Sequence, residues 1–149
     1  DVQFDVGRVR GPSAGLAFSL AVIDVLSEGE LTGGKKVATT GTINPAGVVG
    51  PVGGVPQKIE AARRAGIEVF LVPPSELLDA AAAAGDALEV RCIQTLDDAV
   101  LVLTEFGGNG LAVAEAFGAP APEQSPNPID PDDGFETCAE VEGQLAAIS

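Results

Sequence analysis

Three strand patterns alternate with three helix patterns along residues 35–106, and this order constrains the fold more than any other feature. The strand patterns are "KKVATTGTI" (35–43), "IEVFLVP" (67–73) and "LEVRCI" (88–93). Helix patterns follow them at 55–65, 75–84 and 95–106. A chain that alternates in this way places crossover helices over a sheet. We therefore predict an α/β (α+β) domain with a small mixed sheet and packed helices.

Local signals mark the ends of these elements. An alternating pattern predicts a strand at 1–6, and an apolar run predicts a helix at 12–26. Pro12 suits a first helical position, Ser75 and Thr95 suit N-caps, and Gly66 suits a left-handed C-terminal cap. We place a core domain at 1–107. We expect an acidic, Pro-rich, partly disordered tail at 108–149, with a short terminal helix within 135–149.

Charge excludes several classes of partner. The chain has 149 residues and a formal net charge of −14. All eight basic residues lie at or before Arg91, so residues 92–149 carry only acidic charge. Such a chain does not neutralise a phosphate backbone, and we expect no nucleic-acid partner. The acidic tail is typical of a solvated, solubilising segment.

The absence of histidine excludes much catalytic chemistry. A Ser-His-Asp triad, a Cys-His pair and an H-E-x-x-H zinc site all require it. The phosphate-binding patterns G-x-x-x-x-G-K-[ST] and G-x-G-x-x-G do not occur either. We therefore expect no metal and no cofactor.

Two cysteines, Cys92 and Cys138, are too few for a disulfide scaffold. They could pair in an oxidising compartment and tie the tail to the body. Two unrelated thiols, one of them buried, is the slightly favoured alternative.

Lys58 stands out among the three lysines. It shares the stripe of Val55, Ile59 and Ala62 in the predicted helix 55–65, whereas Lys35 and Lys36 are typical solvated charges. Burial and the positive end of the helix dipole both disfavour an ammonium group there. Lys58 can thus accept a proton from a serine; the alternative is a side chain that reaches water from the helix edge.

Ser13 lies in "GPSAG" (11–15) at the start of an apolar helix. A serine there is most often a cap, but Ser13 follows Pro12 and so falls inside the first turn. Its hydroxyl is then free to face a cleft, and the unpaired N–H groups of the turn can hold an oxyanion.

Three stretches together resemble the proteolytic domain of Lon proteases. They are "GPSAG" (11–15), "TTGTI" (39–43) and "GVVGPVGGVPQKIEAARRAGIEVFLVP" (47–73). The resemblance implies a Ser13 nucleophile, a Lys58 base and a Thr40 that orients the lysine. The residues we assign to the oxyanion and substrate sites are Gly11, Pro12, Ala14, Thr42 and Gly53.

The sequence also departs from that family. Thr42 stands where the family's Thr-Gly-Glu element has Glu, and Arg10 stands where an acidic residue often precedes G-P-S. An AAA+ ATPase module and several early strands of the family are missing from this sequence. These features resemble the Lon-like branch that carries an upstream PDZ domain and a membrane anchor. The resemblance thus implies a protease domain outside the cytoplasm.

The expected function is that of a serine endopeptidase acting on peptides or unfolded proteins, ATP-independent in this chain. By resemblance we expect a homo-oligomer, a hexamer. A catalytically inactive assembly or peptide-binding module is the alternative, favoured by the departures at Arg10 and Thr42. A phosphate-binding Gly-rich module is disfavoured by the few basic residues near the glycines.

Overall fold

A three-stranded parallel sheet forms the centre of the molecule. The computed structural model describes residues 11–27, 29–109 and 137–148. The strands are β1 (Val37–Thr39), β4 (Val69–Val72) and β5 (Glu89–Cys92), in the order β1-β4-β5. Val69 of the central strand pairs with Val37 on one side and Glu89 on the other. The predicted fold class is confirmed.

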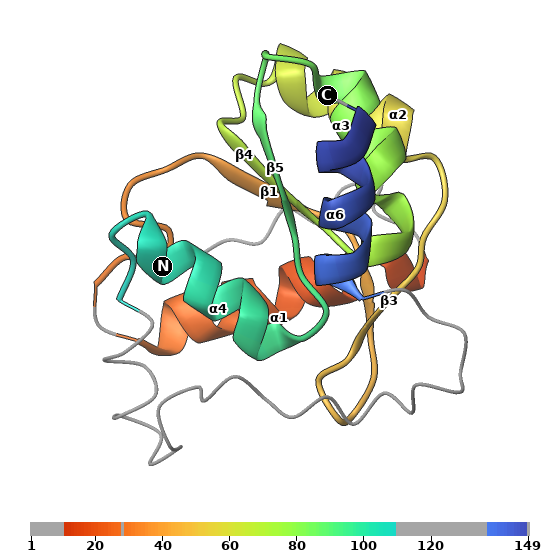
Figure 1. The fold of residues 1–149 in the computed structure, drawn as a ribbon. Helices are drawn as coiled ribbons and strands as arrows, with labels where there is room; N and C mark the ends of the chain where they lie inside the picture. Colours follow the sequence, from red (N-terminus) through yellow and green to blue (C-terminus); the bar gives the residue numbers. More distant parts are fainter. Residues whose placement is uncertain (1–10, 28, 110–136, 149) are drawn as a thin grey trace.

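Helices cover both faces of this sheet (Figure 1). On one face lie α1 (Gly15–Leu26) and α4 (Leu96–Glu105). On the other lie α2 (Val55–Arg64), α3 (Leu77–Ala84) and α6 (Cys138–Ile148). Two short 3₁₀ turns, η1 (Pro12–Ala14) and η2 (Pro74–Glu76), lead into α1 and α3.

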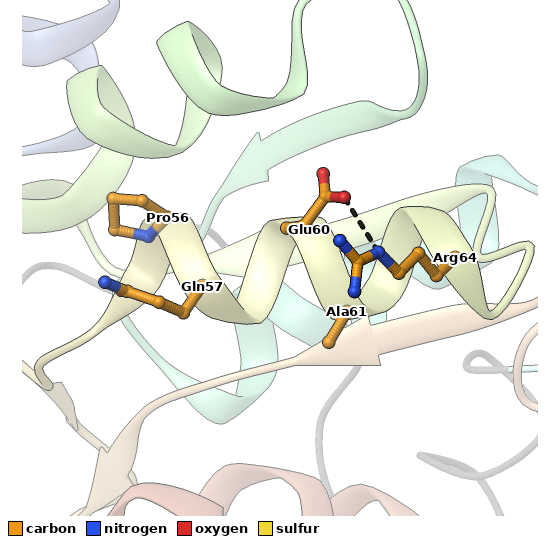
Figure 2. Close-up of a pocket in the computed structure, with 5 residues that line it drawn as sticks. All are labelled: Pro56, Gln57, Glu60, Ala61 and Arg64. Atoms are coloured by element: carbon orange, nitrogen blue, oxygen red, sulfur yellow. Dashed lines mark hydrogen bonds and ion pairs between the residues drawn. The ribbon is translucent and has the colours of Figure 1, made fainter.

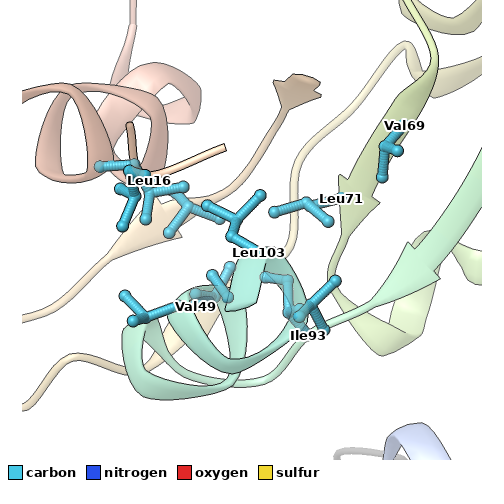
Figure 3. Packing of buried hydrophobic residues seen from close by; sticks show 11 residues of the cluster. Leu16, Val49, Val69, Leu71, Ile93 and Leu103 are labelled. Atoms are coloured by element: carbon cyan, nitrogen blue, oxygen red, sulfur yellow. The ribbon is translucent and has the colours of Figure 1, made fainter. Parts of the chain in front are cut away.

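The central strand supplies both halves of the core. All four residues of β4 are apolar and buried, as expected for a parallel strand covered on both sides. Val69 and Leu71 join the cluster beneath α1 and α4, part of which Figure 3 shows with Leu16, Val49, Ile93 and Leu103. Phe70 and Val72 join the cluster beneath α2, α3 and α6.

The strand predicted at 35–43 is wrong as a single element. The chain leaves the sheet after β1 and forms a separate antiparallel hairpin of β2 (Thr42–Ile43) and β3 (Val49–Gly50). Thr40 is the last residue held by the sheet, because its N–H donates to the Leu71 carbonyl at 3.2 Å. The change of direction falls on Gly41, which has a positive φ.

The predicted caps have mixed outcomes. Thr95 is the N-cap of α4 in a capping box closed by Asp98, and Gly66 follows α2 with φ +74°, so both predictions are confirmed. Ser75 is not an N-cap, because it lies within η2 and α3 begins two residues later. Its hydroxyl donates to Glu76 instead.

The ends of the chain are described only in part. The predicted strand at 1–6, Arg10 and most of the predicted tail lie outside the described residues. Helix α6 falls within the segment where a short terminal helix was expected, and the domain boundary at 107 stays a prediction. No helix in the described ranges is long and apolar enough to cross a membrane.

Candidate active site

Ser13 lies in the 3₁₀ turn that opens α1. No side chain caps this turn, and Gly11 precedes it with φ +96°. Ser13 is half-buried, and among the described residues its hydroxyl has no hydrogen-bond partner. The N–H groups of Ser13 and Ala14 lack intrahelical acceptors because they belong to the first turn. A free hydroxyl beside free N–H donors suits attack on a carbonyl group.

Lys58 contacts Thr40 across the gap between α2 and the end of β1. Its Nζ donates to the Thr40 Oγ1 at 3.0 Å. Thr40 is 3% exposed, and Lys58 is half-buried. The apolar stripe of α2 therefore carries Lys58 inward, as its spacing predicts. The exposed residues Arg63 and Arg64 turn outward instead and pair with Glu60.

Backbone contacts join the Ser13 turn to Thr40–Gly41. The Gly41 N–H donates to the Ser13 carbonyl at 3.0 Å, and the Leu16 N–H donates to the Gly41 carbonyl at 3.2 Å. A Cβ at Gly41 would collide with the Val49 side chain, so the two segments meet at a residue without a side chain. Ser13 and Lys58 are thus connected through two adjacent residues, Thr40 and Gly41. No hydrogen bond joins the Ser13 hydroxyl directly to Lys58 Nζ in the described structure.

The other predicted site residues lie close in sequence to Ser13, Thr40 or Lys58. Gly11, Pro12 and Ala14 belong to the Ser13 turn or directly precede it. Thr42 is on β2, opposite Gly50, one residue beyond Gly41. Gly53 is exposed, in the loop between β3 and α2. The structure describes all five positions, while their roles in the oxyanion and substrate sites stay predictions.

A surface hollow lies on another face of α2. Figure 2 shows it lined by Pro56, Gln57, Glu60, Ala61 and Arg64. Its lining does not include Ser13, Thr40 or Lys58. The hydrogen bond from Arg63 is the main reason why the pKa of Glu60 lies below its ordinary value. In the described part of the chain, no cluster of three or more His, Cys, Asp or Glu side chains is suited to a metal ion.

Two features of the structure differ from the favoured predictions or were not predicted. Cys92 and Cys138 form a disulfide, so the slightly favoured alternative of two unrelated thiols is wrong. The two cysteines are 46 positions apart in the sequence and are brought together by β5 and α6. Their spacing in the sequence does not indicate how close they lie in the folded chain. The second feature is Glu76, a buried carboxylate whose Oε1 accepts from the Val52 N–H at 3.2 Å. The apolar residues on both sides of Glu76 in the sequence are a signal that could have predicted its burial.

Comparison with known proteins identifies the family. Residues 7–114 match the model of the Lon protease (S16) C-terminal proteolytic domain. The chain therefore belongs to this family of proteolytic domains, and the resemblance of its motifs to Lon proteases is confirmed. The match includes every residue that we assigned to the site.

Individual relatives agree with this assignment. A Lon protease of Trichlorobacter lovleyi is 35% identical over 124 residues, which cover 81% of this chain and 14% of that protein. An archaeal Lon protease of Methanocaldococcus jannaschii is 32% identical, over 73% of this chain and 16% of its own length. Lon protease 1 of Sorangium cellulosum is 37% identical, over 60% and 11%. The chain thus matches only a small part of these curated relatives.

Proposed function

We propose that this chain is a serine endopeptidase in which Ser13 is the nucleophile and Lys58 the general base. The observation that supports it most is the 3.0 Å hydrogen bond from Lys58 Nζ to Thr40 Oγ1, beside the backbone bond that joins Gly41 to Ser13. Three segments far apart in sequence meet there. The proteolytic family of the chain supports the same activity.

The proposed reaction has two halves. The Ser13 oxygen attacks the peptide carbonyl carbon while neutral Lys58 takes the hydroxyl proton, and N–H groups of the Ser13 turn stabilise the oxyanion. The C–N bond breaks, and Lys58 delivers the proton to the leaving amine. Water then attacks the acyl ester while Lys58 takes a proton from it. The C–O bond to Ser13 breaks, Lys58 returns the proton to the Ser13 oxygen, and the acid product leaves. Thr40 keeps Lys58 oriented, and none of these steps uses ATP.

The proposed substrates are peptides and unfolded proteins, and the proposed assembly is a homo-oligomer, hexameric by resemblance. The departure at Thr42 favours a second candidate, an inactive peptide-binding or assembly module. The disulfide supports a location in an oxidising compartment outside the cytoplasm, since such bonds are rare in reducing cytosol. That location agrees with the Lon-like branch carrying an upstream PDZ domain and membrane anchor.

Intact-mass spectrometry with a peptide boronate tests the proposal, because a boronate adds reversibly to an activated serine without turnover. We expect one adduct per chain, none in Ser13→Ala, and strong loss in Lys58→Ala. Both variants should lower peptide hydrolysis by roughly 10³-fold or more. Ser19→Ala and Lys35→Ala are the matched controls, since Ser19 donates to Gly15 and Lys35 is exposed beside Glu68.

The two candidate functions give opposite results. An adduct lost in both variants and kept in both controls supports the endopeptidase. A folded wild-type chain that forms no adduct, and still binds peptide, favours the inactive module. Lys58→Ala should remain folded, because it removes a half-buried polar side chain rather than a packed apolar group.

A further inference from the structure

Glu76 is a buried acid that the proposed chemistry does not use. It lies at the end of η2 and is only 8% exposed. Its Oε1 accepts from the Val52 N–H, and its Oε2 accepts from the Ser75 hydroxyl. Within the described residues, no lysine or arginine forms an ion pair with it. Burial of a carboxylate is costly unless its oxygens are bonded, so these two contacts are what keep it there.

The contact with Val52 is a polar anchor for a mostly exposed loop, whose Val52 side chain also packs against the apolar cluster beneath α2 and α3. The loop of residues 51–54 connects β3 to α2, and three of its members, Pro51, Gly53 and Gly54, are exposed. In the described structure, the Val52 N–H bond is the single hydrogen bond that ties residues 51–53 to the rest of the molecule. Two adjacent glycines make such a loop costly to order, because glycine loses the most backbone freedom on folding.

This loop leads directly into the residue proposed as the base. Gly54 precedes α2 in a left-handed conformation, with φ +69° and ψ +31°. Its carbonyl accepts the Lys58 N–H at 3.2 Å, while Lys58 Nζ donates to Thr40 at 3.0 Å. Lys58 is thus held at its backbone by Gly54 and at its side-chain end by Thr40. A shift of Gly54 moves the first of these two supports.

We propose that Glu76 is a positioning residue for Lys58. By accepting the Val52 N–H, it sets the 51–54 loop and the first turn of α2, so that Lys58 Nζ stays on Thr40. The catalytic consequence rests on the proposed endopeptidase function. The structural tie from Glu76 to Val52 stands independently of that function.

Peptide hydrolysis by Glu76 variants tests this role. Glu76→Leu keeps the volume and removes the acceptor, and we expect kcat to fall about 10- to 100-fold with KM changed less than about twofold. In Glu76→Gln the amide oxygen accepts the Val52 N–H and the amide group donates to Ser75. We therefore expect this variant to restore kcat to within about threefold of wild type. Asp79→Asn, an exposed acid on the neighbouring α3, is the matched control with unchanged kinetics.

Hydrogen exchange at the Val52 amide gives a readout that needs no activity. Glu76→Leu should accelerate exchange at Val52, and Glu76→Gln should not. Where Glu76→Leu does not fold, Glu76→Asp serves instead, because its carboxylate is one methylene too short to reach Val52. Glu76→Asp should then lower kcat and speed Val52 exchange.

The outcomes separate this inference from the proposed function. Wild-type kcat in Glu76→Leu or Glu76→Asp, unchanged Val52 exchange, or a Glu76→Gln variant as impaired as Glu76→Leu would each overturn the positioning role. Hydrolysis that persists in Ser13→Ala, or is missing from wild type, contradicts the endopeptidase instead. In that case the Val52 exchange rates still test the hydrogen bond between Glu76 and Val52, because they do not depend on activity.

Discussion

Helices α2 and α6 pack on the same side of the sheet, yet they are held there by different forces. α2 buries three apolar residues, Val55, Ile59 and Ala62. α6 has a similar length but buries only Val141. It is fixed by the Cys92–Cys138 disulfide and by a bond from the Cys138 N–H to Gln94 Oε1. The comparison shows that apolar burial places the helix of the proposed base, whereas a covalent bond places the terminal helix.

The sequences of the two helices account for this difference. The α2 sequence has one apolar stripe and a charged opposite face, so its docking is specified along its whole length. The α6 sequence has Gly143 in its middle, and its last residue, Ile148, is 77% exposed. A glycine in a helix interior costs about 1 kcal/mol relative to alanine. A helix with one buried residue therefore needs the disulfide to remain docked.

The largest effect on stability should come from Ile59→Ala in α2. Ile59 is fully buried, so truncation removes its packing and leaves a cavity between α2 and the sheet. We expect the free energy of unfolding to fall by about 4 kcal/mol, as measured by urea denaturation. Arg64→Ala, on the exposed face of the same helix, should change it by less than about 1 kcal/mol. Equal losses in the two variants would contradict the dominance of burial in α2.

Loss of the disulfide should have the next largest effect. In the Cys92→Ala/Cys138→Ala double variant, a closure across 46 positions is removed from the unfolded chain. We expect the free energy of unfolding to fall by about 3 kcal/mol, and amide exchange to increase first in α6. Reduction of the wild-type protein should reproduce this result and leave the double variant unchanged. Exchange in α6 that stays slow in the double variant would show that the helix docks without the bond.

The smallest effect concerns acid conditions at the start of α6. The hydrogen bond from the Thr137 backbone N–H holds the pKa of Glu140 below its ordinary value. Because the pKa is depressed in the folded state, the stabilisation is complete above the ordinary value. It is then lost as pH falls through the depressed one. We expect amide exchange in α6 of the reduced protein to increase, relative to that of α4, below about pH 4.

Glu140→Gln is the control for this acid effect. It removes the titrating group and should therefore abolish the additional exchange in α6 at low pH. Thr137→Ala keeps the backbone donor to the Glu140 carboxylate and removes the hydroxyl, which donates to that carboxylate and accepts the Glu140 N–H. It should therefore speed exchange in α6 at every pH and weaken the acid effect without abolishing it. An α6 helix whose exchange follows that of α4 at every pH would refute the role of Glu140.

Much of the fold was predictable because its signals are local. The apolar stripe of α2 gave the direction of Lys58, and the Thr95 pattern gave the start of α4. The break of the first strand at Thr40–Gly41 was not predictable in this way. It depends on the Leu71 carbonyl, on Val49 and on Ser13, which lie elsewhere in the sequence.

The candidate site shows the same division. The position of Ser13 inside a first turn followed from Pro12, and that prediction agrees with the structure. The pairing of Lys58 with Thr40 came from the family resemblance, since no local pattern links two residues 18 positions apart. Glu76 was missed, and the disulfide was only the less favoured of two alternatives, because burial and thiol pairing depend on tertiary contacts, which periodicity does not report.

The surroundings of Gly41 limit which amino acids this position can accept. Its N–H and carbonyl are both bonded to the Ser13 turn, and any Cβ there would overlap Val49 and approach Leu16. A smaller side chain at position 49 would remove this overlap but would not fully rescue a substitution of Gly41. The φ of +158° at Gly41 also disfavours L side chains. Position 41 therefore strongly favours glycine. A saturation library selected for a folded Ser13 turn should return glycine at this position and a wider range at Thr42.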